Sequence, residues 1–422
     1  MACYGNSWIK TPSLNALSEE AFIFERAYVS QPVCTPARAT IVTGLYPHTA
    51  GPTLNTIPLP PERKTIAEYL RDSYTTAYFG KWHLGNDGNA QHGFQHWITT
   101  QDDGTAFVGL EGEPSKSDYH NYLVEKGYEP DATLPQSQTY VPRGVVRNVP
   151  DNWEVFSSAK RTEVEAEDSM AHFLVRKASE FIKAHSDESF VLYVSTFEPH
   201  SPYNGAYNDL YDPATLPTGP SFLKKPEGGS LLNRLIAENN LQFLKGSSES
   251  YMGHVERVTR FNDISSEYGW KQLRARYFAN VTLVDDMVGM ITEALKQQDI
   301  FDDTVVVFTS EHGDMSGDHG MLHKMSMYEE SARVPLLIRA PALSTGKTVI
   351  GGNVSQVDLV PTLLDLLGCD VPEGLDGKSV AKVLCSSLHS NLHLTHIFNR
   401  NIESKRSNWV PEEVVWTENI KE

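Results

Sequence analysis

The sequence has few cysteines, no long apolar run and a deficit of positive charge. Its 422 residues include four cysteines, which show neither the spacing of a metal site nor that of a disulfide framework. No stretch is long and apolar enough to span a membrane, and no signal peptide is visible at the start. The formal net charge of −18 argues against a nucleic-acid-binding protein, which would need a basic face.

The remaining composition is that of a globular protein. Hydrophobic residues make up 40% and charged residues 21% of the chain, which is ordinary for a folded domain. The length allows one large α/β domain or two modest ones. The negative charge still permits an anionic substrate, because a metal ion and a few cations can reverse the local potential.

The most informative stretch is QPVCTPARATIVTG, from Gln31 to Gly44. Pro36 fits the first turn of a helix, and Gly44 fits the position just past its end. Cys34 is therefore predicted at a helix N-terminus, where free N–H groups and the helix dipole favour negative charge. Arg38 follows one turn later on the same side. These residues suit the binding of an oxyanion, although taken alone they also fit a buried structural cysteine.

Predicted strands alternate with predicted helices along the chain. The strands cover residues 22–30, 74–79, 190–197, 304–309 and 335–339. Besides the helix at Cys34, helices are predicted at residues 11–17, 65–71, 274–298 and 358–367, with a further one opened by a capping box at residues 162–165. Residues 86–161 and 204–270 are predicted to be loops and short elements. This alternation predicts an α/β layered fold with a largely parallel sheet.

Polar clusters follow three of these strands, at Gly80, Glu198 and Ser310. In open α/β sheets, the ligand site lies beyond the carboxyl ends of the strands. The pattern therefore predicts that three distant segments meet at one site, with Cys34 as the fourth contributor.

Each cluster contains residues with both a functional and a purely structural interpretation. Lys81 and His83 would point to one face if the extended geometry of the strand continues. A solvated lysine and a packed histidine fit this segment equally well. His200 lies between two prolines that stiffen its loop, but it also fits a turn histidine without a role.

The loop of residues 311–320, EHGDMSGDHG, directly follows a strongly apolar strand. Its carboxylates are hard oxygen ligands of the kind that suit calcium or magnesium. A solvated charged loop is the alternative, and the position of the loop at a strand end weakens it. Lys324 follows shortly afterwards and also fits a surface lysine, while Arg333 is expected to support the fold.

The pattern C-x-P-x-R at Cys34, followed by TGLYPH at residues 43–48, closely resembles the signature of the formylglycine-dependent sulfatases of the alkaline phosphatase superfamily. The runs GKWH, PHSP, EHGD and HK later in the chain resemble further family segments. The resemblance covers residues 2–384. It implies an alkaline-phosphatase-like fold, with a central, largely parallel mixed sheet and helices on both faces. It also implies a catalytic domain over residues 1–385 and a divergent or incomplete C-terminal segment at 386–422.

The resemblance implies a nucleophile and a metal site. Cys34 would be oxidised after synthesis to formylglycine by a formylglycine-generating enzyme, and the hydrate of formylglycine would be the nucleophile. Cys34, Glu311 and His312 would bind the metal ion, which is expected to be Ca²⁺, with Mg²⁺ or Mn²⁺ as alternatives. Glu311 stands where the family usually has aspartate.

The remaining site residues follow from the same resemblance. Arg38, Lys81 and Lys324 would neutralise the sulfate oxygens. His200 would contact the sulfate or the leaving group, and His83 would deprotonate the formylglycine hydroxyl.

The start of the chain, MACYGN, resembles the segment that follows the first strand of sulfatases. That strand normally carries two metal-binding aspartates, so we expect the chain to be truncated at its N-terminus. The resemblance favours a periplasmic or secreted location over a cytoplasmic one.

The function expected from the sequence is hydrolysis of a sulfate monoester. A sulfated carbohydrate is preferred as substrate because the insertions are rich in aromatics, although aryl esters and simple packing use the same side chains. These aromatics include Trp97, Tyr119, Tyr122, Trp153, Tyr207 and Tyr211. One alternative is a phosphonate or phosphate-ester hydrolase of the same superfamily. A second is a non-catalytic remnant that lacks half of the metal site.

Overall fold

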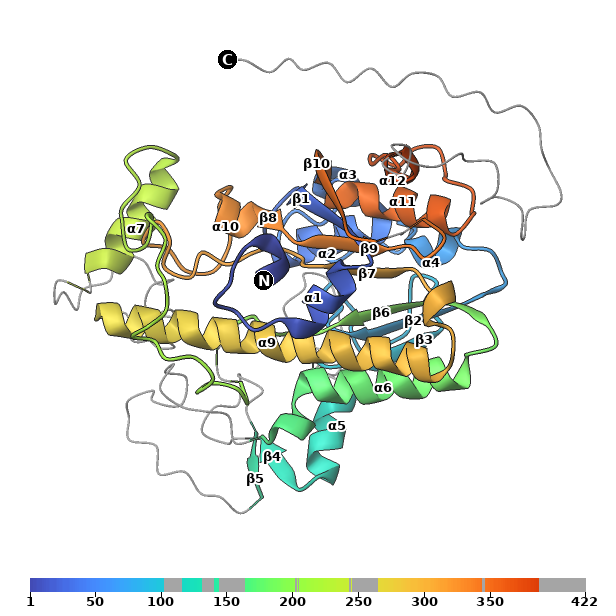
Figure 1. The fold of residues 1–422 in the computed structure, drawn as a ribbon, viewed down its shortest axis with the longest axis horizontal. Coiled ribbons are helices and arrows are strands. Elements are labelled where there is room, and N and C mark those ends of the chain that lie inside the picture. The colour runs from blue at the N-terminus through green and yellow to red at the C-terminus, as the bar shows by residue number, and fades with distance from the viewer. Residues whose placement is uncertain are drawn as a thin grey trace.

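The computed structural model arranges the chain in layers, with sheets in the middle and helices on both sides (Figure 1). It describes residues 1–101, 116–130, 140–143, 164–201, 203, 205–242, 244, 265–343 and 346–386. All four cysteines lie in these ranges, and none forms a disulfide. Among the helices within these ranges, none has the length and apolar character needed to cross a bilayer.

The first of two main sheets is entirely parallel. Its central strand is β2 (Tyr74–Gly80), which lies between β3 (His96–Thr99) and β6 (Ser189–Ser195). Both neighbours run in the same direction as β2, so the carboxyl ends of all three strands meet at one edge.

The second sheet is mixed and has the strand order β10-β1-β9-β7. Strand β1 (Phe22–Tyr28) is parallel to β10 (Thr348–Ser355). Strand β9 (Leu336–Arg339) is antiparallel both to β1 and to β7 (Val306–Thr309), and the short strand β8 (Arg333–Val334) also pairs with β1 in the antiparallel direction.

The expectation of a largely parallel sheet is therefore correct for the first sheet and wrong for much of the second. Besides the two-residue strand β8, the segment between β7 and β9 contains a single four-residue helix, α10 (Glu329–Ala332). It is a returning loop and not a crossover helix, so β9 runs back along β7. A separate hairpin pairs β4 (Tyr128–Pro130) with β5 (Tyr140–Pro142).

The two main sheets lie side by side without joining. Among the described strands, β6 pairs only with β2 and β7 only with β9. Both strands nevertheless belong to one layer (Figure 1). Leu192 and Val306 pack against one apolar cluster, and Val194 and Phe308 pack against the next. The inner edges of the two sheets therefore form a seam held by side-chain packing.

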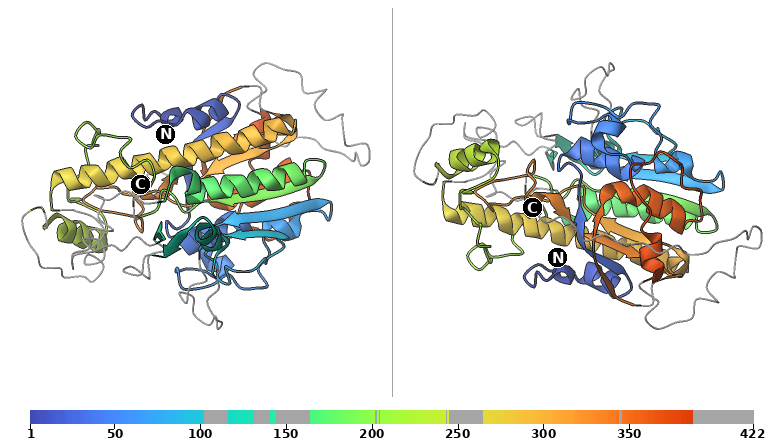
Figure 2. Two further views of the ribbon diagram at one scale, coloured as in Figure 1. Left: turned by 90° about the horizontal axis from the view of Figure 1, so that it is seen from below. Right: turned by 90° about the horizontal axis from the view of Figure 1, so that it is seen from above.

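Helices cover both faces of this layer, as predicted. On one side lie α6 (Met170–Ala184) and α9 (Glu267–Gln297), which pack along each other (Figure 2). On the other side lie α2 (Cys34–Thr43) and α11 (Leu359–Leu366).

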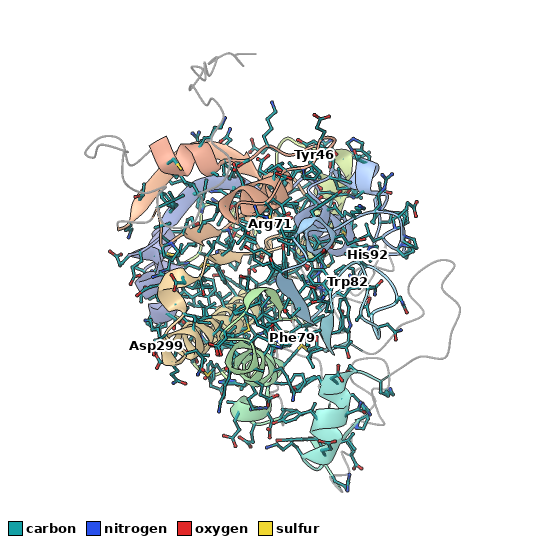
Figure 3. The ribbon with its side chains drawn as sticks, turned by 90° about the vertical axis from the view of Figure 1, so that its right-hand side faces the viewer. Tyr46, Arg71, Phe79, Trp82, His92 and Asp299 are labelled. Atoms are coloured by element: carbon teal, nitrogen blue, oxygen red, sulfur yellow. The ribbon has the colours of Figure 1, made fainter. Side chains whose placement is uncertain are left out.

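Strand β2 shows why both faces are covered. Its side chains alternate between two apolar clusters, because successive residues of a strand point to opposite faces. Tyr78 packs with Trp82 and with residues of α2 and α11, such as Ala39. Phe79 packs against Phe181 of α6. Figure 3 labels both Phe79 and Trp82, which lie on different sides of the strand.

Two helix boundaries differ from the predictions. Helix α9 begins at Glu267, seven residues before the predicted start at residue 274, because the side chain of Ser266 caps it by accepting from the Gly269 N–H. Helix α6 begins at Met170, where Ser169 caps it. The predicted capping box at 162–165 does not open α6, and its residues 162 and 163 lie outside the described ranges.

The other helices are short. They are α1 (Pro12–Ser18), α3 (Pro47–Ala50), α4 (Ile66–Tyr69), α5 (Asp118–Glu125), α7 (Leu231–Gln242) and α12 (Ala381–Ser386). The C-terminal segment predicted at 386–422 lies outside the described ranges beyond its first residue.

Candidate active site

The N-terminus of α2 carries Cys34, as the sequence predicts. Val33 is extended and Cys34 is the first helical residue, with only 2% of its surface exposed. Gly44 ends the helix in the left-handed conformation with φ of 70°. The Asn55 side chain accepts the Thr35 N–H at 3.0 Å and so satisfies one free group of the first turn.

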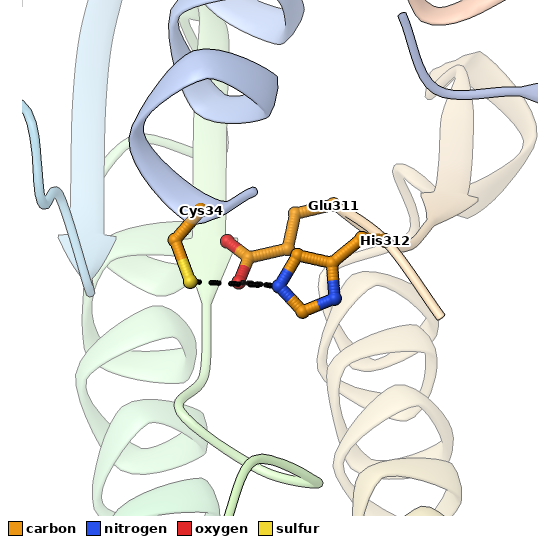
Figure 4. Close-up of side chains that lie close together, drawn as sticks. All are labelled: Cys34, Glu311 and His312. Carbon is orange, nitrogen blue, oxygen red and sulfur yellow. Dashed lines mark hydrogen bonds and ion pairs between the residues drawn. The ribbon is translucent and has the colours of Figure 1, made fainter. Parts of the chain in front are cut away.

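Cys34, Glu311 and His312 form a compact group (Figure 4). The Cys34 Sγ lies 3.5 Å from His312 Nε2, and that nitrogen lies 3.0 Å from Glu311 Oε1. One ligand atom from each residue falls within 4.8 Å of the others. His312 Nδ1 lies 2.8 Å from the Gly313 carbonyl, to which it donates, so the ring orientation is fixed. Within the described part of the chain, this is the group that could hold a metal ion.

Glu311 lies between two buried cations. Arg38 Nε forms an ion pair with Glu311 Oε2, and Lys81 Nζ lies 3.8 Å from Oε1. Burial alone would raise the pKa of Glu311, but Arg38, Lys81 and His312 hold that pKa well below its ordinary value. Burial would also lower the pKa of His312, yet the Glu311 carboxylate raises it to about 9. A cation bound to His312 Nε2 would therefore have to displace a proton.

Arg38 also connects α2 to the ends of β2 and β6. Its Nη1 donates to the Lys81 carbonyl at 2.6 Å and to Ser195 Oγ at 2.8 Å, with Tyr78 Oη at 3.5 Å. Sequence reasoning missed Ser195 and Tyr78, because single residues at strand ends carry no recognisable motif.

His200 and Lys324 meet from opposite sides of the seam. Lys324 Nζ lies 2.6 Å from His200 Nε2, and His200 Nδ1 lies 2.6 Å from the Ser201 carbonyl. The carbonyl only accepts, so Nδ1 carries the proton and Nε2 accepts from the lysine. Burial, together with the charges of Lys324 and Lys81, lowers the pKa of His200, although Cys34 opposes this. His200 is thus a neutral imidazole.

The Cys34 thiol is acidified by this surrounding. Burial and the Glu311 charge both oppose its ionisation. Lys81, the hydrogen bond from His312 and the nearby His200 outweigh them and hold the pKa of Cys34 well below its ordinary value.

The extended geometry of β2 does not continue to His83, which has φ of 55°. Strand β2 ends at Gly80, where a Cβ atom would lie 1.9 Å from the Ser195 carbonyl oxygen, so glycine permits the turn. The two side chains then reach different partners. Lys81 approaches Glu311, whereas His83 Nδ1 lies 3.2 Å from Thr35 Oγ1, beside Cys34.

A second polar connection joins the loops after β6 and β7. Tyr203 Oη donates to Asp314 Oδ2 at 2.6 Å, and Asp314 Oδ1 accepts from the Ser316 N–H at 2.8 Å. Burial would raise the pKa of Asp314, but His323, Tyr203 and Ser316 lower it. Asp314 lies in the EHGD run and Tyr203 directly follows the PHSP run, but the family resemblance assigned neither of them a role.

The residues on both sides of Lys324 have an unusual backbone conformation. His323 and Met325 have φ of 63° and 76°, a left-handed conformation that is uncommon for residues other than glycine. The Met325 N–H donates to the Pro32 carbonyl at 3.1 Å. The position of Lys324 is therefore tied to the segment that precedes Cys34.

The remaining residues singled out in the sequence mainly support the fold. Arg333 donates to the Glu25 carbonyl at 2.7 Å and lies 3.6 Å from Glu329, as expected for a supporting residue. The insertion aromatics within the described ranges pack in apolar clusters: Trp97, Tyr119, Tyr122, Tyr207 and Tyr211. Trp153 lies outside those ranges.

The chain matches the sulfatase family model over residues 1–369. It is 28% identical to an ulvan-active sulfatase of Formosa agariphila over 90% of this chain and 61% of that protein. It is also 27% identical to the multifunctional alkaline phosphatase superfamily protein PehA of Trinickia caryophylli, over 91% of this chain and 73% of that protein.

Among solved structures, the phosphonate monoester hydrolase SpPMH of Silicibacter pomeroyi is similar, with a TM-score of 0.69 and 26% identity over 90% of this chain and 72% of that chain. The layered α/β fold and these neighbours place the protein among the enzymes of the alkaline phosphatase superfamily. The chain belongs to the sulfatase family, a family of sulfuric ester hydrolases. It spans 61% of the length of its Formosa relative.

Proposed function

We propose that this chain hydrolyses sulfate monoesters at the site around Cys34. The observation that carries the proposal is the convergence of a buried cysteine at a helix N-terminus with three cations and two histidines. Helix N-termini favour anions, and the cations add to that preference. The family match over residues 1–369 supports the same chemistry.

The proposal includes a converted residue 34 and a divalent cation, expected to be Ca²⁺ with Mg²⁺ or Mn²⁺ as alternatives. The Cys34 sulfur stands where formylglycine would carry a hydroxyl oxygen, a harder ligand. Glu311, His312 and residue 34 fit a cation as three ligands. Calcium takes six to eight, so water, substrate or other groups must supply the rest. When present, formylglycine supplies the nucleophilic hydroxyl and the cation neutralises charge on the sulfate.

The chain's own residues then bind the sulfate and move protons. Arg38 and Lys81 neutralise the oxygens that gain charge in the transition state. Lys324 is the proton donor to the leaving oxygen, because neutral His200 has its only N–H committed to the Ser201 carbonyl. His200 orients the lysine by accepting from it. His83, beside Thr35, takes the proton from the hydroxyl of residue 34.

The second candidate is hydrolysis of phosphonate or phosphate esters. The similarity to a phosphonate monoester hydrolase favours it, because the same cations would bind a phosphonate oxygen. A non-catalytic role is the third candidate, favoured by the three-residue ligand set. A formylglycine-generating enzyme as partner, and a periplasmic or secreted location, remain predictions from the family resemblance.

The test combines mass spectrometry with paired assays. The protein is coexpressed with a formylglycine-generating enzyme, and the Cys34 peptide is analysed for conversion of the thiol to an aldehyde, in which oxygen replaces sulfur and two hydrogens are lost. Activity is measured with 4-nitrophenyl sulfate and with a phenyl phosphonate ester, with added Ca²⁺ and after chelation. Sulfate hydrolysis that requires the converted residue supports the proposal. An active enzyme in which Cys34 keeps its unmodified thiol would contradict the mechanism. Faster phosphonate turnover would establish the second candidate.

A further inference from the structure

A cavity of about 680 Å³ lies beside the candidate active site. Its walls come from four separate segments, around Pro32, Leu54, Leu232 and Met325. This volume is in the range that holds a small organic ligand.

The cavity shares residues with the reacting centre. Lys324 lines the cavity, and its Nζ lies 2.6 Å from His200 Nε2. Val33, which also lines it, directly precedes Cys34. The wall is closed by the backbone hydrogen bond from Met325 to Pro32. A group attached to the sulfate through the oxygen that Lys324 protonates would therefore extend into this cavity.

The solvent-exposed part of the cavity lining consists largely of apolar side chains. The side chains of Leu54, Leu232, Met325 and Met327 are between 53% and 69% exposed. Such a group of exposed large apolar side chains around one hollow usually marks a binding surface. Methionine is flexible and polarisable, so two of them can adapt to ligands of different shape.

Three of the polar side chains in the lining, those of Gln31, Asn55 and Ser230, are engaged within the protein. Gln31 donates to the Thr53 carbonyl at 2.8 Å, and Asn55 accepts from the Thr35 N–H. Ser230 accepts from the Asn233 N–H at 3.1 Å, which holds the loop before α7. A sugar would need several free polar partners for its hydroxyl groups, because unpaired buried hydroxyls are costly. The lining instead suits a ligand with few polar atoms.

We propose that this cavity binds the leaving group of the ester, and that the substrate class is the sulfates of apolar alcohols or phenols. This inference rests on the proposed sulfatase function and names the substrate of the same site. It competes with the preference for a sulfated carbohydrate, to which the packed aromatics of the insertions add no support.

The first experiment measures binding without turnover. A series of linear alkyl sulfonates, from methyl to hexyl, is titrated into the intact protein by calorimetry. Each added methylene is expected to strengthen binding about threefold to fourfold, as burial of a methylene in an apolar site does. Leu232→Asn should flatten this dependence. Leu235→Asn is the matched control, because Leu235 is 45% exposed on the same helix but does not line the cavity.

An affinity that does not depend on the length of the alkyl group would overturn the inference. An equal effect of Leu232→Asn and Leu235→Asn on that dependence would overturn it as well. The same holds if a second copy of the chain occupies the cavity, which would appear as a Leu232-dependent dimer that excludes the sulfonates. None of these outcomes depends on turnover.

The second experiment compares hexyl sulfate with glucose 6-sulfate, both esters of primary alcohols. We expect at least a tenfold higher kcat/KM for hexyl sulfate, and a loss of that preference in Leu232→Asn but not in Leu235→Asn. A preference for the sugar would refute the apolar leaving group. Absence of turnover with 4-nitrophenyl sulfate as well would instead count against the proposed function, while the sulfonate titration would still decide on the cavity.

Discussion

The two sheets of this protein contribute to the site in different ways. The parallel sheet supplies Lys81, His83 and His200 from the segments that follow β2 and β6. The mixed sheet supplies Cys34 from the helix after β1, and Glu311 with the rest of its loop after β7. In the parallel sheet, strand direction alone brings the segments to one edge. In the mixed sheet, β9 is antiparallel to both β1 and β7, so the carboxyl ends of β1 and β7 also lie at one edge, and the returning loop between β7 and β9 adds Lys324.

Polar contacts at the site connect the two sheets. Among the described strands, no backbone pairing crosses from β6 to β7. Arg38 reaches the Lys81 carbonyl, Lys324 reaches His200, and Tyr203 reaches Asp314. The geometry of the candidate site therefore depends on a few side chains that cross the seam, and changes at these side chains test the comparison directly.

The largest effect is expected for Arg38→Ala. The substitution removes the link between α2 and the parallel sheet and leaves the buried Glu311 carboxylate with less compensation. We expect the free energy of unfolding to fall by roughly 3 kcal/mol. We also expect kcat/KM to fall about 10² to 10³-fold, because a charge facing the sulfate is lost. Chemical denaturation and assays with 4-nitrophenyl sulfate measure the two changes.

Arg339→Ala provides the matched control for this variant. Arg339 is also a buried arginine, but its partners, the Phe301 carbonyl and Asp302, precede β7 and so lie at the opposite end of that strand from Glu311. It should lower stability and leave the activity of the folded protein unchanged. Equal activity losses in both variants would show that Arg38 acts through general stability and not through the site.

A smaller effect is expected for Lys324→Ala. This variant removes the proton donor to the leaving oxygen, so kcat should fall by about 10²-fold. The loss should be greatest for alkyl sulfates and least for 4-nitrophenyl sulfate, whose leaving group needs little protonation. Steady-state kinetics with both substrates measures the difference. Lys347→Ala, at a surface pair with Glu19, is the control. A uniform loss across leaving groups would contradict the assigned role.

Tyr203→Phe is expected to have a moderate effect. It removes one hydrogen bond across the seam, which should lower the free energy of unfolding by about 1 kcal/mol. Activity should fall several-fold, because Asp314 positions the loop that carries His312. Tyr211→Phe removes a comparable hydroxyl, bonded to Thr282, outside the site. If both variants lose stability but neither loses activity, the Tyr203 contact does not position the site.

The smallest effect is expected for Glu198→Gln, on the parallel-sheet side of the seam. Burial raises the pKa of Glu198, although hydrogen bonds from Thr196 and backbone groups oppose this. The stabilising contribution of this carboxyl is therefore complete at pH values below the pKa that it has in the unfolded chain. It is lost as the pH rises through the higher pKa that it has in the folded protein. The glutamine variant should match the wild type near pH 4 and be slightly more stable at pH 8. Denaturation curves across this range measure the difference, and a gap that grows toward acid would contradict it.

Local chemistry accounts for what the sequence predicts well. Pro36 and Gly44 mark the start and the end of the helix that begins at Cys34. The apolar runs predict β2, β6 and β7 to within a few residues of their observed bounds. Polar residues at strand ends then identify most of the candidate site. These features depend on neighbours in the chain, so they are readable without the fold.

Contacts between distant residues account for what the sequence does not predict. Tyr203 and Asp314 are 111 residues apart, and the pairing of β9 with both β1 and β7 depends on a loop without periodicity. The turn at His83 depends on the close approach of β2 and β6 at Gly80. The apolar cavity gathers short runs of residues from four segments, and their convergence depends on the fold.

The seam between β6 and β7 also matters for how the chain associates. A strand edge with free backbone N–H and C=O groups is a template for the addition of another strand. Among the described strands, β6 and β7 present two such edges in one layer, and a single extended segment can pair with either of them. The candidate active site lies across the same seam, so self-association through strand exchange would begin at the place where the proposed activity resides.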